Sequence, residues 1–122
     1  MTFREILAHV IDQTPGALAG AIMGSDGIAV EEYSAEGSDI DLGAVVVEFG
    51  GVFGQLRKVA GSLYGEGTDG LEELVLCTRK HQLLFRAIDD EYLFVVALDP
   101  LGLLGKARFL VRSVMEPLRS EL

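Results

Sequence analysis

Few residues of this 122-residue chain have the type and spacing that catalysis or metal binding requires. His9 and His81 lack cysteines or carboxylates at metal-ligand intervals, and Cys77 has no second cysteine to form a CxxC pair. No Ser/His/Asp or Cys/His set is visible, although such groups can be distant in sequence. We therefore predict a protein that is not an enzyme, with no metal and no cofactor. His9 is expected on a helix surface, His81 in a turn, and Cys77 as a small core or interface residue.

Two further motifs suggest chemistry only superficially. The segment Gly102-Leu-Leu-Gly-Lys106 is similar to a phosphate-binding loop, but Pro100 and Ala107 stand where that loop needs glycine and serine or threonine. We expect this segment inside a helix, without nucleotide binding. The cluster Asp89-Asp90-Glu91 could attract a cation or a basic partner, but a solvated hairpin turn is the favoured interpretation.

Composition narrows the classes of partner. The formal net charge is −9, which disfavours nucleic acid and anionic membrane surfaces because both need a basic protein surface. A single cysteine excludes an intrachain disulfide. The richest apolar run, 42–56, contains Glu48, and no run reaches the ~18 residues of a membrane span. The start of the chain lacks the apolar core of a signal peptide. We expect one domain over 1–122 in the cytoplasm.

The N-terminal part predicts a helix followed by a hairpin. Thr2 and Glu5 form a capping box in front of a helix over 3–13, where apolar residues recur at helical spacing. Strands are expected over 18–23 and 28–33. The turn Ser25-Asp26-Gly27 joins them, with Gly27 able to adopt positive φ.

The remainder predicts a long helix, three strands and a last helix. Asp39 is expected to cap the long helix, with Asp41 in its first turn, and the helix should end at Gly65-Glu66-Gly67. Strands follow over about 71–78, 83–88 and 92–98, and a final helix runs from Pro100 towards 118, with Pro117 near its end. The fold class is α/β of the α+β type: a five-stranded antiparallel sheet between one long central helix and two terminal helices.

The long helix has two unlike sides on a helical wheel. One is an apolar stripe: Leu42, Val45, Val46, Phe49, Phe53, Leu56, Ala60 and Leu63. The other side is poor in side chains: Gly43, Ala44, Val47, Gly50, Gly51, Gly54, Lys58, Gly61 and Ser62. Each interior glycine costs about 1 kcal/mol relative to alanine. Small residues let helix backbones approach closely, so we expect this side to pair with a second copy. The alternative is packing within the same chain.

Four passages in this order resemble the roadblock/dynein light chain family, and most of all its bacterial MglB branch. They are residues 20–29 (GAIMGSDGIA), 83–88 (LLFRAI), 92–100 (YLFVVALDP) and 104–108 (LGKAR). The resemblance implies a roadblock-like fold and a homodimer, formed by pairing of the central helices and of the edge strands over 72–78. It also implies a small Ras-like GTPase partner (MglA-like), whose GTP hydrolysis is modulated, and in that branch stimulated without an inserted arginine.

Two residue sets follow from these expectations. The dimer interface is assigned to Gly43, Val47, Gly50, Gly51, Gly54, Gly61, Leu74 and Leu76. The GTPase-binding set is Glu48, Gln55, Arg57, Lys58 and Ser62, of which Arg57 and Lys58 could reach a partner from the end of the helix. The alternatives are a ligand-binding sensor domain and a generic dimeric adaptor with no GTPase partner.

Overall fold

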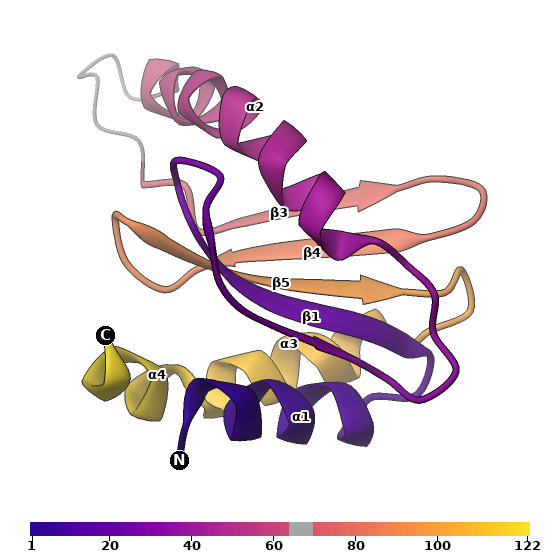
Figure 1. The fold of residues 1–122 in the computed structure, drawn as a ribbon. Coiled ribbons are helices and arrows are strands. Elements are labelled where there is room, and N and C mark those ends of the chain that lie inside the picture. Colours follow the sequence, from indigo (N-terminus) through magenta and orange to yellow (C-terminus); the bar gives the residue numbers. More distant parts are fainter. Residues whose placement is uncertain (64–69) are drawn as a thin grey trace.

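A computed structural model describes residues 1–63 and 70–122 as a three-layer arrangement (Figure 1). In chain order the elements are α1 (Phe3–Gln13), β1 (Ala17–Gly24), β2 (Ala29–Ser34), α2 (Leu42–Ser62), β3 (Glu73–Cys77), β4 (Gln82–Ala87), β5 (Tyr92–Leu98), α3 (Leu104–Ser113) and α4 (Met115–Glu121). The sheet is antiparallel throughout, in the order β2-β1-β5-β4-β3. Helix α2 covers one face, and α1, α3 and α4 cover the other. The predicted α+β fold class is confirmed.

Two apolar cores flank the sheet, and β5 contributes to both. Phe94, Val96 and Leu98 of β5 belong to the core under α1, α3 and α4. The alternating residues Leu93, Val95 and Ala97 belong to the core under α2. A strand buried on both faces reads as a continuous apolar run, which is why the sequence predicted covered faces here.

Helix α1 begins and ends where the sequence predicts. The Thr2 hydroxyl accepts a hydrogen bond from the Glu5 amide (3.1 Å), and the Glu5 carboxylate accepts one from the Thr2 amide (2.9 Å). This backbone hydrogen bond from Thr2 lowers the pKa of the Glu5 carboxyl below its ordinary value.

The hairpin of β1 and β2 also forms as predicted, with Gly27 at φ 89° in the turn and the Gly24 amide donating to the Ile28 carbonyl at 2.8 Å.

The start of α2 differs from the prediction. Asp41 is the N-cap, because its carboxylate accepts a hydrogen bond from the Ala44 amide at 3.1 Å. Asp39 lies exposed before the helix, so the prediction that it is the cap is wrong. The predicted end of the helix at 65–67 lies outside the described residues. Within the described residues, no helix combines the length and apolar character of a membrane span.

The predicted final helix is two helices. A turn follows β5, in which the Gly102 amide donates to the Asp99 carbonyl at 3.0 Å, so Pro100 precedes the helix instead of starting it. The helix then breaks at Val114, whose φ and ψ are −102° and 2°. Pro117 lies in the first turn of α4, where the amide that proline lacks is not needed.

The glycines of α2 do not share one outward face, contrary to the prediction. A Cβ atom on Gly50 would lie 2.4 Å from Cα of Gly27, so Gly50 faces the β1–β2 turn of its own chain. Gly61 is buried, and a Cβ on Gly43 would meet the ends of the Glu32 and Asp41 side chains. Gly51 and Gly54 have nothing within 4 Å of an added Cβ. The intrachain alternative therefore accounts for Gly50.

We expect Gly50→Ala to lower the free energy of unfolding by about 1–3 kcal/mol, because the added methyl group would overlap a backbone that cannot move aside. Gly105→Ala, in α3, is the matched control. Nothing lies within 4 Å of a Cβ there, so it should raise stability by up to about 1 kcal/mol. Urea denaturation measures both, and equal stability of the two variants would contradict the close approach.

Candidate protein-docking face

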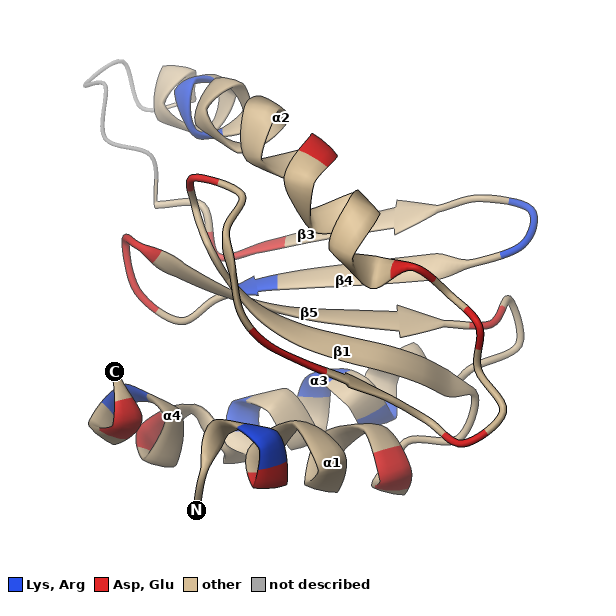
Figure 2. Ribbon diagram, viewed as in Figure 1, with Lys and Arg blue, Asp and Glu red and all other residues tan. Residues whose placement is uncertain are grey.

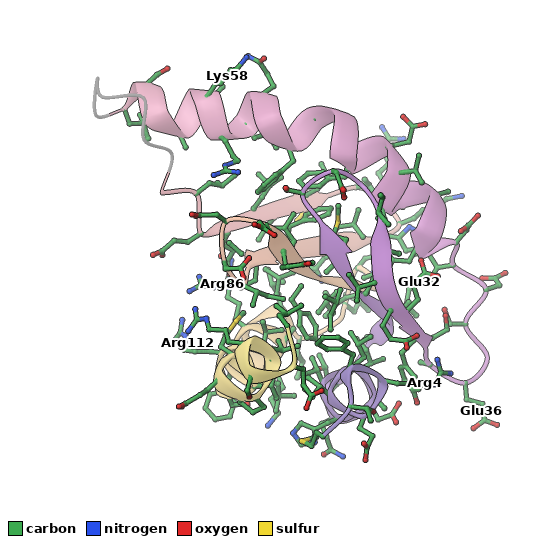
Figure 3. All side chains as sticks on the ribbon, turned by 60° about the vertical axis from the view of Figure 1, so that its left-hand side comes forward. Arg4, Glu32, Glu36, Lys58, Arg86 and Arg112 are labelled. Carbon is green, nitrogen blue, oxygen red and sulfur yellow. The ribbon has the colours of Figure 1, made fainter. Side chains whose placement is uncertain are left out.

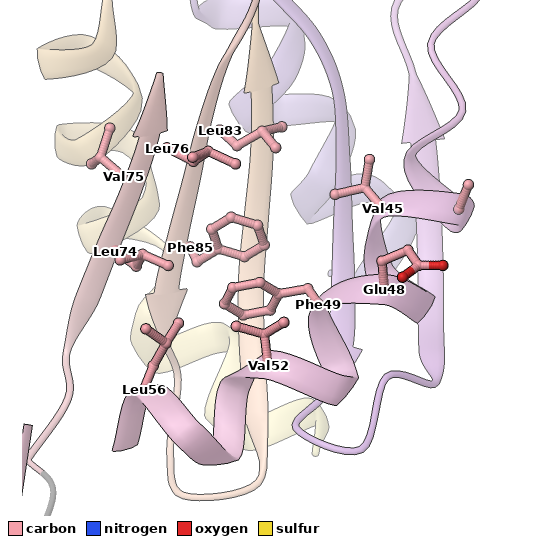
Figure 4. Close-up of a pocket in the computed structure, with 11 residues that line it drawn as sticks. Val45, Glu48, Phe49, Val52, Leu56, Leu74, Val75, Leu76, Leu83 and Phe85 are labelled. Atoms are coloured by element: carbon pink, nitrogen blue, oxygen red, sulfur yellow. The ribbon is translucent and has the colours of Figure 1, made fainter. Parts of the chain in front are cut away.

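An apolar groove lies between α2 and the β3–β4 edge of the sheet, with a volume of about 670 Å³ (Figure 4). We call it the α2–β3 groove. It is lined by Ala44, Val45, Glu48, Phe49, Val52, Leu56, Leu74, Val75, Leu76, Leu83 and Phe85. Glu48 is the one charged residue in this lining. The groove can therefore bury apolar surface, but it brings together no groups for proton transfer or metal binding.

The groove forms because α2 crosses the sheet off-centre. Leu42 and Val46, near the start of the helix, are buried, and the helix packs most closely on β1 and β2. Further along, Phe49 reaches down to β4 and stacks on Phe85, with ring centroids 3.9 Å apart and planes 14° from parallel. Phe53 lies beside Phe49 at 5.7 Å. The rings of Phe49 and Phe85 line the groove, and Leu74, Val75 and Leu76 line it from β3 (Figure 4).

Helix α2 exposes apolar residues both in the groove lining and beyond it. Val52 and Val59 are about half exposed and Val47 is 66% exposed. Gly51 and Gly54 are open to the surface beside them. Leu76 extends the apolar surface onto β3, where it is half exposed. Exposed apolar surface is typical of interaction sites, so this face is the candidate docking surface.

Strand β3 forms one edge of the described sheet, with β4 as its neighbour. Its second edge presents backbone groups that another strand could pair with. The prediction that the strand over 72–78 is an edge strand is therefore confirmed. Cys77 lies exposed at its end, so the prediction of a core position is wrong and the interface prediction stays untested.

The structure brings together part of each predicted set. Val47, Gly51 and Gly54 lie on the exposed side of α2, and Leu74 and Leu76 line the groove from β3. Gly43, Gly50 and Gly61 lie against or within their own chain. Of the predicted GTPase-binding residues, Glu48, Gln55, Lys58 and Ser62 are exposed on α2.

Arg57 is placed apart from the other GTPase-binding candidates. Its Nη1 donates to the Asp90 carbonyl at 3.2 Å, and its guanidinium lies 5.7 Å from the centroid of the Phe53 ring. The side chain is half-buried and directed towards the β4–β5 turn. It therefore helps to hold the C-terminal half of α2 over the sheet.

Sequence reasoning missed Val52 and Val59 and assigned Phe49, Val45 and Leu56 to an ordinary core stripe. These last three are only half-buried because they face the groove. A signal was present: Val52 and Val59 are seven residues apart and so lie on one helix face beside the core stripe. The apolar arc on α2 is therefore wider than a helix needs in order to pack on one face of a sheet.

The residues with catalytic potential are dispersed. His9 is exposed on α1, and His81 lies in the connection between β3 and β4, both as expected. The Asp89 carboxylate accepts hydrogen bonds from the Glu91 and Tyr92 amides, so this acidic cluster forms the expected hairpin turn. The segment 102–106 runs from a turn into the start of α3, so it lies only partly inside a helix. In the described residues, no three His, Cys, Asp or Glu side chains converge on a metal position.

The elements and the sheet define a three-layer α+β domain, and comparison with known structures gives the same fold. The chain is 33% identical to MglC from Myxococcus xanthus over the whole of both chains, with a TM-score of 0.70. The gliding protein MglB from Thermus thermophilus matches at 20% identity and a TM-score of 0.78, over 92% of this chain and 82% of that one. A Roadblock/LC7 domain from Streptomyces avermitilis matches at 15% identity and 0.74, over 98% and 99%.

No protein-family model and no curated protein sequence matches the chain. The full-length similarity to MglC nevertheless shows the family, and the more distant structures share the fold. The chain belongs to the roadblock/LC7 family, and MglB-like members are among the proteins that it resembles.

We expect the Phe49–Phe85 stack to couple α2 to the sheet by about 0.5–1.5 kcal/mol beyond the area that the rings bury. A double-mutant cycle with Phe49→Leu and Phe85→Leu, followed by urea denaturation, measures this coupling free energy. The control cycle pairs Phe49→Leu with Phe3→Leu, because Phe3 packs on the other core. A coupling no larger than in the control would show that the stack does not anchor α2.

Proposed function

We propose that two copies of this chain pair through the α2–β3 groove and that the dimer docks a small Ras-like GTPase and modulates its GTP hydrolysis. The observation that carries the proposal is the apolar groove between α2 and the edge strand β3, together with the other apolar residues that α2 exposes. Burying apolar surface contributes about 25 cal/mol per Å². A second copy offers the same apolar surface and the same unpaired edge, as a two-fold interface requires.

The open glycines of α2 support a partner at this surface. Gly50 is explained within the chain by its contact with Gly27, but Gly51 and Gly54 have no such neighbour. Each costs about 1 kcal/mol in a helix interior relative to alanine. A second helix backbone packed against them offsets that cost, since a side chain there would hold the two helices apart. The proposed dimer interface therefore centres on Gly51, Gly54, Val47, Leu74 and Leu76.

The GTPase partner is proposed from family membership together with the polar residues around this surface. Glu48, Gln55, Lys58 and Ser62 are exposed on α2 among its apolar residues, and such polar residues are common in transient protein interfaces. Stimulation is proposed to act through the GTPase's own catalytic groups. The side chain of Arg57 supports this, because it is engaged with Asp90 and Phe53 of its own chain.

A ligand-binding sensor is the second candidate, favoured by the groove volume of about 670 Å³, which is within the range of small-molecule pockets. Such pockets use several placed polar groups to orient a ligand. The groove lining has one charged group, Glu48. Native mass spectrometry of the purified chain tests this candidate, and a retained small molecule of constant mass would favour it over pairing.

We expect the free protein to be a dimer at micromolar concentration and Gly54→Leu to convert it largely to monomer, because the new side chain stands where two backbones meet. Gly105→Leu is the control: that glycine is equally open but lies on α3, across the sheet. Light scattering coupled to size-exclusion chromatography measures the mass. A wild-type monomer, or a Gly54→Leu dimer as stable as wild type, would refute this interface.

We expect the dimer to raise the hydrolysis rate of its MglA-like GTPase, and Arg57→Ala to retain that effect within about threefold. An inserted arginine finger would make the same substitution cost about a thousandfold or more. Lys58→Glu should instead raise the concentration needed for half-maximal stimulation several-fold, because Lys58 is exposed beside the proposed contact.

Single-turnover GTP hydrolysis with increasing amounts of each variant separates these effects. Binding without any change in rate would refute stimulation and reduce the role to scaffolding. Absence of binding by a dimeric protein would refute the GTPase partner and leave the dimer standing.

A further inference from the structure

A basic patch interrupts the otherwise acidic surface on the face of the sheet opposite α2. Four of the chain's ten Lys and Arg residues contribute to it: Arg86 of β4 and Lys106, Arg108 and Arg112 of α3. Figure 2 shows the blue positions along α3 and at one end of β4, against red positions on β2, in the loop before α2 and in the β4–β5 turn. We call these four residues, together with Phe109, the α3 patch.

The guanidinium groups of the α3 patch outnumber the carboxylates that face them. Arg86, Arg108 and Arg112 line one shallow depression together with Glu73, and Arg86 and Arg112 extend from the same side of the molecule (Figure 3). The Arg108 Nε atom donates to both Glu73 carboxylate oxygens at 3.1 Å. Arg86 lies opposite Glu73 in the strand register. Within residues 1–63 and 70–122, however, the side chains of Arg86 and Arg112 make no hydrogen bond or ion pair.

Phe109 adds an exposed aromatic ring to this cluster. The ring is 61% exposed on α3, and the Lys106 ammonium lies 5.6 Å from its centroid. The stability of the fold explains only part of this arrangement. Arg112 lies in the last turn of α3, where a positive charge interacts favourably with the helix dipole, and Arg108 is paired with Glu73. Fold stability does not explain an exposed ring beside the Lys106 ammonium or two further arginines in one depression, because exposed apolar surface and like charges in proximity both cost free energy.

We propose that the α3 patch is a docking site for a short acidic segment of a partner protein, with Phe109 packing on an apolar residue of that segment. Arginine guanidinium groups pair well with carboxylates. The patch supplies two guanidinium groups, those of Arg86 and Arg112, that are not engaged with described residues. The depression has a volume of only about 10 Å³, which leaves no room for a small organic ligand. Extended polyanions such as nucleic acid or a membrane would also meet the remaining surface of a chain of net charge −9. A short segment contacts only the patch.

This site lies on the opposite face of the sheet from α2, and it shares with the proposed dimer contact only β3, through Glu73. Helix α2 and helix α3 cover opposite faces of the sheet, so a partner on one face leaves the other accessible (Figure 1). The acidic segment is therefore expected to bind whether or not the α2 face is occupied.

The test uses the full chain and a fluorescein-labelled synthetic peptide of glutamates with one central phenylalanine. Fluorescence anisotropy at low and at physiological salt measures its affinity. Arg86→Glu/Arg112→Glu is expected to weaken binding about tenfold or more, because the two new carboxylates repel the acidic peptide. Phe109→Ala should weaken binding several-fold at both salt concentrations, because its contribution is apolar and not screened.

The matched control is Arg79→Glu/Lys80→Glu, which makes the same change of charge in the exposed β3–β4 turn and should retain near wild-type affinity. Thermal melting checks folding, and Arg86→Gln/Arg112→Gln, which removes charge without reversing it, should show an intermediate loss. Equal losses in patch and control variants would overturn the proposal. So would failure of the wild type to bind at low salt, or binding to phosphatidylserine vesicles in preference to the peptide.

Discussion

The close approach of α2 to the β1–β2 turn determines which part of the sheet α2 covers and which part it leaves open. Gly50 of the helix and Gly27 of the turn meet without room for a Cβ atom on Gly50. This contact holds the helix over the β1 and β2 half of the sheet, while the Phe49–Phe85 stack and the Arg57–Asp90 hydrogen bond fix its further course. Because one helix of this width does not also cover β3, this edge of the sheet becomes a wall of the apolar groove.

An uncovered groove is costly for an isolated soluble domain, and the chain does little to reduce that cost. The groove lining contains one charged residue, Glu48. Charged side chains in place of Val52 or Leu76, which are half exposed, would hydrate this surface without disturbing the core. Edge strands that must remain unpaired usually carry charges or a bulge, whereas β3 presents Leu74 and Leu76 on one side of its pleat. These features are consistent with a surface that is covered in the working protein.

Much of the fold could be predicted because local signals there agree with tertiary packing. The capping box of α1, the Gly27 turn and the doubly buried β5 each follow from residue type and spacing. The glycines of α2 were different: a helical wheel gives their direction around the axis but not what lies in that direction. Whether Gly50 faces water, a partner or its own hairpin depends on the crossing of α2 over β1, which involves contacts far apart in sequence. The split of the last helix at Val114 has a local signal in Pro117, which has no amide to donate to the carbonyl of Ser113, but the prediction took this proline as marking the helix end.

The two faces of the sheet differ in the physics that would hold a partner on each. On the α2 face the available interaction is burial of apolar surface, which salt screens little; on the α3 face it is charge, which is screened over a Debye length of about 8 Å at physiological ionic strength. Strand β5, buried on both sides, separates the two and gives each face its own core. Contacts on the α2 face can therefore be long-lived while contacts on the α3 face exchange rapidly, because breaking a solvated ion pair requires less reorganisation than exposing an apolar groove. If both proposals hold, the two faces would differ in how long they retain a partner, without any change in the fold of the domain between them.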